Sequence, residues 1–98
     1  MKNILLVCSS GMSTNMLVLR MKKFAKSMNF DANIWHSGDV TLKEEVVKAD
    51  IILLAPQVRY LLDKLNKMVN NKKPILLISL NDYSSMNCKK ILQGCLSC

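Results

Sequence analysis

Four short apolar runs recur along the chain, and the segments between them carry apolar residues at spacings of three and four. The runs lie at 3–8, 32–35, 50–55 and 74–78. Apolar side chains that follow one another without alternation are typical of strands buried on both faces. The pattern therefore predicts four strands, and the three longest runs favour a parallel sheet that is covered on both sides.

Helices are predicted over the intervening segments. They span 13–28, 41–48, 58–69 and, more weakly, 88–96. In the first of them Leu17, Met21 and Ala25 recur at the spacing of one helix face, and Asn29 is a suitable stop. The alternation of strands and helices predicts an α/β fold, an open four-stranded parallel sheet with helices on both faces and right-handed crossovers. The whole chain is expected to form one domain.

Two local details complete the helix predictions. Thr41 and Glu44 have the spacing of a capping box, in which side chains bond backbone amides at the start of a helix. Gly94 falls inside the last predicted helix and is expected to interrupt it. The second helix is therefore expected to be opened by Thr41, and the last helix to be the weakest.

Composition narrows the class of protein. The net charge is +7, but the lysines are scattered and the few aromatic residues are not interleaved with them, which argues against nucleic-acid binding. No apolar run approaches the ~20 residues of a membrane span, and the start of the chain is too short for a signal peptide. We therefore expect a soluble cytoplasmic protein whose four cysteines are reduced thiols.

The segment after the first strand carries the candidate chemistry. Cys8 ends the strand, and small residues with one glycine lead into the first helix. Backbone amides in such a loop, backed by a helix N-terminus, bind anions and stabilise a thiolate over a thiol. A nucleophilic thiolate beside an anion cradle indicates a covalent phosphocysteine at Cys8. The expected phosphate-binding loop consists of Ser9, Ser10, Gly11, Met12, Ser13, Thr14 and Asn15.

Several other cysteine and phosphate loops fit less well. The loop lacks the second glycine and the lysine of a nucleotide-binding P-loop, and Gly11 stands where a C-x-x-C redox motif needs its second cysteine. The low-molecular-weight phosphatases have an arginine where this chain has Thr14, and the nearest arginine is Arg20. Three alternatives stay open: a phosphatase-like enzyme, a non-enzymatic anion-binding regulatory module, and a cysteine that is only packed in the core.

Two segments together resemble a known family. "CSSGMSTNMLV" is similar to the phosphorylation loop of IIB components in the lactose/cellobiose (chitobiose) branch of the bacterial phosphotransferase system. "LLAPQVRYLL" resembles the exit of that family's third strand, with Gln57 and Tyr60 at matching positions, and Tyr83 fits the exit of the fourth. The chain departs from the family pattern at Ala55, where members often have glycine, and matches only loosely around Tyr83.

The resemblance implies a fold, a reaction and partners. The sheet order is expected to be 2-1-3-4, as in flavodoxin-like and low-molecular-weight tyrosine phosphatase folds. Cys8 is expected to accept a phosphoryl group from a phosphohistidine of the IIA component and to pass it to a sugar held by the membrane-embedded IIC component. Gln57 and Tyr60 are then expected to approach the phosphoryl group or a partner. No cofactor or metal is expected, the protein is expected to be a monomer, and cellobiose, chitobiose, lactose and related β-glucosides all stay open as sugars.

The remaining reactive residues are given ordinary roles. The one histidine, His36, is interpreted as a polar residue at a strand end. Cys95 and Cys98, with Cys88 upstream, lack a fourth metal ligand and are expected to be reactive thiols on a frayed tail. Cations of the first helix are a candidate surface for an acidic partner; they are Arg20, Lys22, Lys23 and Lys26.

Overall fold

The computed structural model describes residues 1–9, 12–38 and 41–97. Four parallel strands form one sheet with the order β2-β1-β3-β4, which confirms the predicted arrangement. The strands are β1 (Lys2–Val7), β2 (Ala32–Ser37), β3 (Ile51–Leu54) and β4 (Ile75–Leu77). Helical segments separate them: α1 (Met12–Ser27), α2 (Leu42–Lys48), the 3₁₀ helix η1 (Pro56–Leu61), α3 (Leu62–Met68), α4 (Leu80–Ser84) and α5 (Cys88–Leu96).

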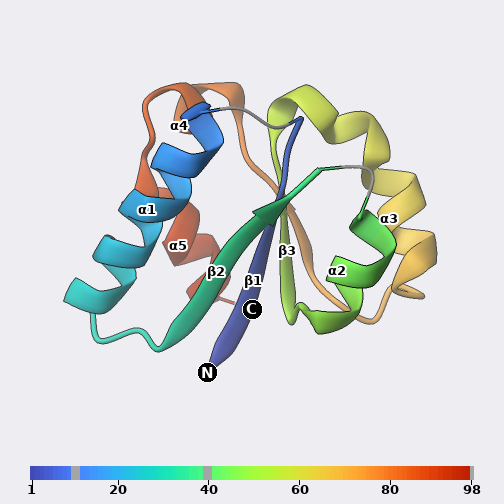
Figure 1. Cartoon of the computed structure of the whole chain (residues 1–98), viewed down its shortest axis with the longest axis horizontal. Helices are drawn as coiled ribbons and strands as arrows, with labels where there is room; N and C mark the ends of the chain where they lie inside the picture. The colour runs from blue at the N-terminus through green and yellow to red at the C-terminus, as the bar shows by residue number, and fades with distance from the viewer. Residues whose placement is uncertain (10–11, 39–40, 98) are drawn as a thin grey trace.

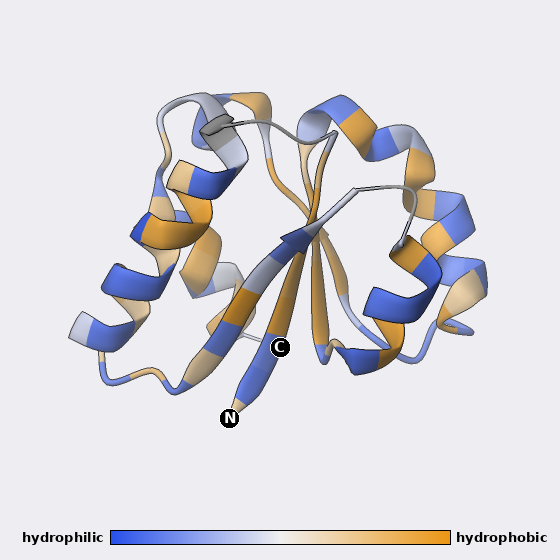
Figure 2. Cartoon of the chain, in the orientation of Figure 1, coloured by the Kyte–Doolittle hydropathy of each residue, from blue (hydrophilic) through white to orange (hydrophobic). Residues whose placement is uncertain are grey.

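The sheet is sandwiched between two layers of helices. Figure 1 shows α1, α4 and α5 on one side of the sheet and α2 and α3 on the other. Side chains of β1 alternate between two cores, with Ile4 and Leu6 on the α1 side and Leu5 and Val7 on the α2 side. All four are fully buried, so a strand that is apolar along its length serves both layers. Figure 2 shows the same pattern as continuous apolar colour along the middle of β1 and β3.

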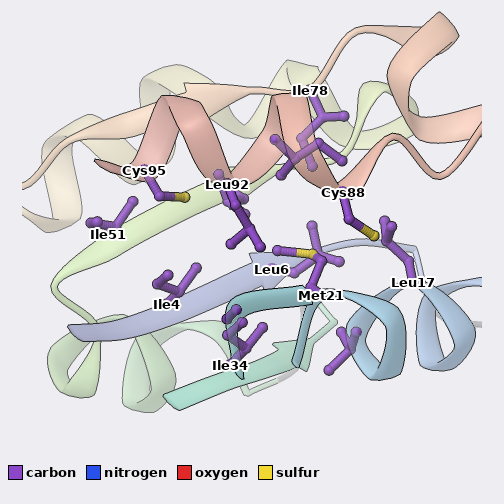
Figure 3. Packing of buried hydrophobic residues seen from close by; sticks show 14 residues of the cluster. Ile4, Leu6, Leu17, Met21, Ile34, Ile51, Ile78, Cys88, Leu92 and Cys95 are labelled. Atoms are coloured by element: carbon purple, nitrogen blue, oxygen red, sulfur yellow. The ribbon is translucent and has the colours of Figure 1, made fainter. Parts of the chain in front are cut away.

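The core on the α1 side is closed by α5. Figure 3 shows Leu6, Met21 and Leu92 packed in this core, and each of them is fully buried. Gly94 does not interrupt α5, contrary to the prediction, because Leu92 and Cys95 on either side of it are buried in the core and hold the helix there. Tertiary packing therefore overrides the low helix propensity of one residue.

Two local predictions are corrected by the structure, and one helix was missed. The helix expected over 58–69 begins as η1, with a kink at Val58 (φ −120°, ψ 23°), and becomes α-helical only at Leu62. Helix α4 was not predicted at all. The capping box does not form, because Thr41 makes no side-chain cap bond and its hydroxyl instead lies 3.1 Å from the Ser37 hydroxyl. By contrast, α1 ends where expected, and Asn29 has a left-handed backbone (φ 57°) that asparagine tolerates.

At the amino edge of the sheet, Asp50 fastens the start of β3 to β1. Its carboxylate accepts hydrogen bonds from the backbone N–H of Asn3 at 2.8 Å and from the Asn3 side-chain amide at 3.2 Å. The bond from the Asn3 backbone is the main cause that holds the pKa of Asp50 below its ordinary value of 3.8. The ionised form of Asp50 is therefore favoured by folding.

This shift predicts a specific acid dependence of stability. Asp50 binds its proton less readily when folded than when unfolded, so its contribution is present above pH 3.8 and is lost as the pH falls through the lowered pKa. In Asp50→Asn, which cannot ionise, the free energy of unfolding is expected to depend less steeply on pH below that value. Urea unfolding of both proteins from neutral to acidic pH measures this. Identical pH dependence in the two would contradict the assignment.

Candidate functional site

Cys8 lies directly after β1, in the middle of the sheet. Its backbone N–H donates to the Ser37 carbonyl at 3.1 Å, and its Sγ lies 3.8 Å from the same oxygen. On the other side, the Ala55 N–H donates to the Val7 carbonyl at 2.9 Å. The thiol therefore stands between the carboxyl ends of β2 and β3, next to the strand-order reversal where open α/β sheets bind ligands.

The thiol is also well covered. Cys8 is 2% exposed and belongs to the core on the α2 side. Burial of this extent is common to packed cysteines, so it does not separate a functional thiol from a structural one. What favours a functional thiol is its position at the edge where the loop to α1 begins.

The N-terminus of helix α1 contributes partial positive charge to this edge of the sheet. The first four N–H groups of a helix have no acceptor within the helix, and the aligned peptide dipoles place partial positive charge there. The sixteen residues of α1 include no aspartate or glutamate, and its first turn has no acidic residue to occupy those amides. An anion next to Cys8 would thus meet donors without competition from the helix's own carboxylates.

The predicted loop residues are only partly described. Ser10 and Gly11 lie outside the described residues, as do the side chains of Met12 and Ser13. Ser9 is exposed at the start of the loop, and Asn15 is exposed in the first turn of α1. Thr14 differs from both, since it is only 2% exposed and its hydroxyl lies 3.0 Å from the Tyr83 hydroxyl. The position that carries arginine in the phosphatases is therefore engaged in a neutral hydrogen bond here.

Gln57 and Tyr60 lie on η1, after the exit of β3. Leu54 pairs with Val7 in the sheet register, so η1 starts beside the end of β1 that carries Cys8. Both side chains are exposed, Tyr60 to 74%, and neither makes a hydrogen bond within the described part of the chain. The structure brings this segment to the correct edge, and a direct role for either side chain stays a prediction.

Sequence reasoning missed two contacts with the first turn of α1, one made by His36 and one by Tyr83. His36 Nε2 lies 2.5 Å from Asn15 Oδ1, so the histidine contacts the first turn of α1 instead of being only a polar surface residue. Tyr83, on α4, contacts Thr14 in the same turn. The signal for His36 was its place near the carboxyl end of β2, adjacent to β1. Tyr83 was noted at the exit of the fourth strand, but its contact with Thr14 had no local signal because α4 was not predicted.

Cys88 and Cys95 do not lie on a frayed tail, contrary to the prediction. Cys88 and Cys95 are buried on α5 in the core on the α1 side, where Figure 3 shows their side chains, and Cys98 lies outside the described residues. Burial raises the pKa of the Cys88 thiol, and the charge of Arg20 opposes that shift. The described residues contain no group of three or more His, Cys, Asp or Glu side chains that could hold a metal ion.

Comparison with known proteins identifies the family to which this chain belongs. The family described as the lactose/cellobiose-specific IIB subunit of the phosphotransferase system (PTS) matches residues 3–94. The chain belongs to this family. The oligo-beta-mannoside-specific EIIB component of Bacillus subtilis (strain 168) is 40% identical over 98 residues, covering 99% of this chain and 95% of its own. The galactose-specific EIIB component of Lactococcus lactis subsp. cremoris (strain MG1363) is 31% identical, covering 93% and 90%.

Solved structures of IIB proteins share the fold. The cellobiose-specific IIB protein of Borrelia burgdorferi aligns with 94% of this chain and 85% of its own, with a TM-score of 0.75 and 46% identity. The lactose-specific IIB domain of Streptococcus pneumoniae aligns with 98% and 95%, with a TM-score of 0.84 and 18% identity, a likeness of fold alone. In the described ranges of this IIB chain, no helix is long and apolar enough to cross a membrane.

Proposed function

We propose that this IIB chain is a phosphoryl carrier that holds the phosphoryl group on Sγ of Cys8. The observation that carries the proposal is the position of Cys8, at the carboxyl end of β1 between β2 and β3, where the chain turns toward the N-terminus of α1. The donor is the phosphohistidine of a IIA component, and the acceptor is a sugar held by the membrane-embedded IIC component. Family membership supports the reaction class. We further propose that the chain works in the cytoplasm and reaches the membrane through IIC.

The proposed chemistry consists of two substitutions at phosphorus. In the first, the Cys8 thiolate attacks the phosphohistidine, an S–P bond forms as the N–P bond breaks, and the histidine of IIA leaves with the electron pair. In the second, a sugar hydroxyl attacks the same phosphorus, an O–P bond forms, the hydroxyl proton is released to solvent and the thiolate returns. Each step needs in-line positioning and stabilisation of the charge on the equatorial oxygens.

Backbone amides are the proposed source of that stabilisation. The segment 8–15 contains no lysine or arginine, so no cationic side chain of the loop can neutralise the phosphoryl oxygens. The N-terminus of α1 supplies donors whose number and direction are fixed by the helix. Ser9, Ser10, Gly11, Met12, Ser13, Thr14 and Asn15 form the proposed cradle, and Gln57 and Tyr60 form its proposed second wall.

The sugar is proposed to be a β-glucoside-type or closely related disaccharide. Relatives of the chain are named for oligo-beta-mannoside, cellobiose and galactose, so the family covers several sugars. The sugar is held by IIC in this scheme, and the IIB chain contributes the phosphoryl group. Its own residues are therefore expected to recognise proteins more than sugar.

Reconstitution of the relay tests the proposal. Phosphoenolpyruvate, the upstream phosphotransferase proteins, a IIA component of this family and membranes with its IIC are combined with and without the chain, and sugar phosphate is measured. The proposal requires sugar phosphate to appear only when the chain is present. Rapid hydrolysis of an aryl phosphate by the chain alone would support a phosphatase instead, and phosphate binding without any transfer would support an anion-binding module.

Charge on α1 is expected to speed the encounter with the donor. Lys22 and Lys23 are exposed on a helix without carboxylates, and Leu19 beside them is 62% exposed. Surface charge mainly changes association rates and is screened by salt. Reversing both lysines to glutamate is expected to slow phosphorylation of the chain about tenfold at low salt and subsaturating donor, and to weaken its salt dependence.

A matched pair of lysines provides the control. Lys43 on α2 and Lys67 on α3 are exposed on the opposite face of the sheet, so Lys43→Glu/Lys67→Glu makes the same change in net charge. Transfer rates at several salt concentrations compare the two double variants. Equal slowing of both would assign the effect to net charge and contradict a docking role for α1.

A further inference from the structure

The first turn of α1 is held from two sides by side chains that come from distant parts of the chain. Thr14 shares a hydrogen bond with Tyr83, 69 residues away, with 3.0 Å between their hydroxyl oxygens. Asn15 Oδ1 accepts a hydrogen bond from His36 Nε2, 21 residues away, with 2.5 Å between the two atoms. Consecutive residues of one helical turn are thus fastened to α4 on one side and to β2 on the other.

Tyr83 is itself firmly placed. Its ring packs against both cores of the protein, the one on the α1 side and the one on the α2 side, at the exit of β4. Its backbone N–H donates to the Ser79 carbonyl at 2.9 Å, and the Ser79 hydroxyl caps α4 by accepting from the Asp82 N–H at 3.1 Å. Figure 1 shows α4 beside the start of α1. The phenolic hydroxyl that contacts Thr14 is therefore held in place by the packing of its ring and by the capped helix α4.

His36 is placed by the sheet. It lies one residue before the end of β2, opposite Leu6 of β1 in the parallel register. The next residue, Ser37, supplies the carbonyl that accepts from the Cys8 N–H. One short stretch of β2 thus contacts both the strand end that carries the thiol and the first turn of the helix that follows it.

We propose that Tyr83 and His36 are positioning residues that fix the first turn of α1 relative to Cys8. The proposal rests on the proposed function, because the amides of that turn matter for catalysis only if a phosphoryl group is held beside the thiol. Preorganised donors stabilise a transition state only when they point at the developing charge, and a misplacement of ~1 Å can cost about a hundredfold in rate. Tyr83 and His36 then act through Thr14 and Asn15, which belong to the cradle itself.

Kinetics of phosphoryl acceptance test the Tyr83 contact. Tyr83→Phe removes only the hydroxyl and keeps the ring in both cores, and Thr14→Val removes the partner hydroxyl with little change of shape. Each is expected to lower the maximal rate of transfer from phosphorylated IIA about tenfold while leaving the half-saturating donor concentration unchanged. Because both remove one shared bond, the double variant is expected to be no slower than either single variant. Thr14→Ser, which keeps a hydroxyl, is expected to restore most of the rate.

The His36 contact is tested with a donor-keeping pair. His36→Ala removes the partner of Asn15, whereas His36→Gln keeps an N–H donor of similar reach. His36→Ala is expected to lower the maximal rate about threefold, a smaller effect because Asn15 is exposed, and His36→Gln is expected to retain it. A rise in the half-saturating donor concentration without a change in maximal rate would assign both residues to docking and overturn the proposal.

A second measurement separates this proposal from the function on which it rests. The amides of Met16, Leu17 and Val18 close the first turn of α1, so their hydrogen exchange reports its opening. Exchange at these amides is expected to be about tenfold faster in Tyr83→Phe than in the wild type. If the wild type accepts no phosphoryl group while exchange rises as expected, the proposed function fails and the positioning role stands. Unchanged exchange together with unchanged maximal rates, or fully additive losses in the double variant, would overturn the positioning role.

Discussion

Replacing Cys8 with serine is expected to lower the rate of phosphoryl acceptance from the IIA component by more than about a thousandfold. A hydroxyl is a weak nucleophile unless a base removes its proton. The one histidine of the chain, His36, is hydrogen-bonded to Asn15 in the described structure. The fold is expected to persist, because serine is slightly smaller and its hydroxyl can donate to the Ser37 carbonyl that now lies near Sγ. Rapid-quench measurement with labelled phosphorylated IIA gives the rate.

The other buried cysteines offer a matched control. Cys88→Ser and Cys95→Ser make the same chemical change in the core on the α1 side, on α5. Both variants are expected to accept the phosphoryl group at a rate within about twofold of the wild type, at temperatures where they are folded. Near-normal acceptance by Cys8→Ser, or an equal loss in a Cys88→Ser protein that is fully folded, would contradict the role of Cys8.

Of the substitutions proposed for this chain, Leu6→Ala is expected to cause the largest loss of unfolding free energy. Leu6 is fully buried on β1, two residues before Cys8, in the core formed with α1 and α5 (Figure 3). Leu6→Ala removes buried apolar groups and leaves a cavity in a closely packed core, which costs about 2–5 kcal/mol of unfolding free energy. That is a large share of the total stability of about 5–15 kcal/mol that is usual for a domain. Chemical denaturation of the variant and the wild type measures the difference.

Leu77 on β4 is the matched control for Leu6. It is also a strand leucine, but it is 53% exposed, so Leu77→Ala removes little buried surface. Its expected cost is below about 1 kcal/mol. Comparable losses at the two positions would show that the two-sided core around β1 does not carry the stability of this fold.

The fold was largely predictable because the strongest sequence signal is also the strongest physical one. The uninterrupted apolar run at 3–8 requires burial on both faces, and burial on both faces requires helices on both sides of the sheet. The helix boundary at Asn29 was predictable because asparagine adopts the left-handed backbone that ends α1. The sheet order came from family resemblance, since local pattern does not specify which strands are neighbours.

The predictions from sequence failed where tertiary contacts, and not local sequence, determine the structure. Thr41 has the sequence of a capping residue, yet its hydroxyl lies against Ser37, a contact between β2 and the residue before α2 that local spacing does not reveal. Gly94 was expected to interrupt α5, but the burial of Leu92 and Cys95 on either side of it keeps the helix packed on the core. Burial likewise places Cys88 and Cys95 in the core, where the sequence alone indicated a loose tail.

The candidate site also has a part that could be predicted from the sequence and a part that could not. Cys8 and the start of α1 were predictable because a strand, a small-residue loop and a helix follow one another in sequence. The contacts of Thr14 and Asn15 were not, because Tyr83 and His36 reach the first turn of α1 from α4 and β2. Residues that position a site are therefore harder to predict from sequence than residues that form it.

The measurement that tests the central claim most directly is the location of the phosphoryl group on the chain. The protein is incubated with phosphoenolpyruvate, the upstream phosphotransferase proteins and a IIA component shown to phosphorylate another IIB protein, and its intact mass and peptides are analysed. The account predicts one added phosphoryl group, on the peptide that contains Cys8, and none in Cys8→Ser. A phosphoryl group on the peptide that contains His36, or an unmodified wild-type chain, would contradict it.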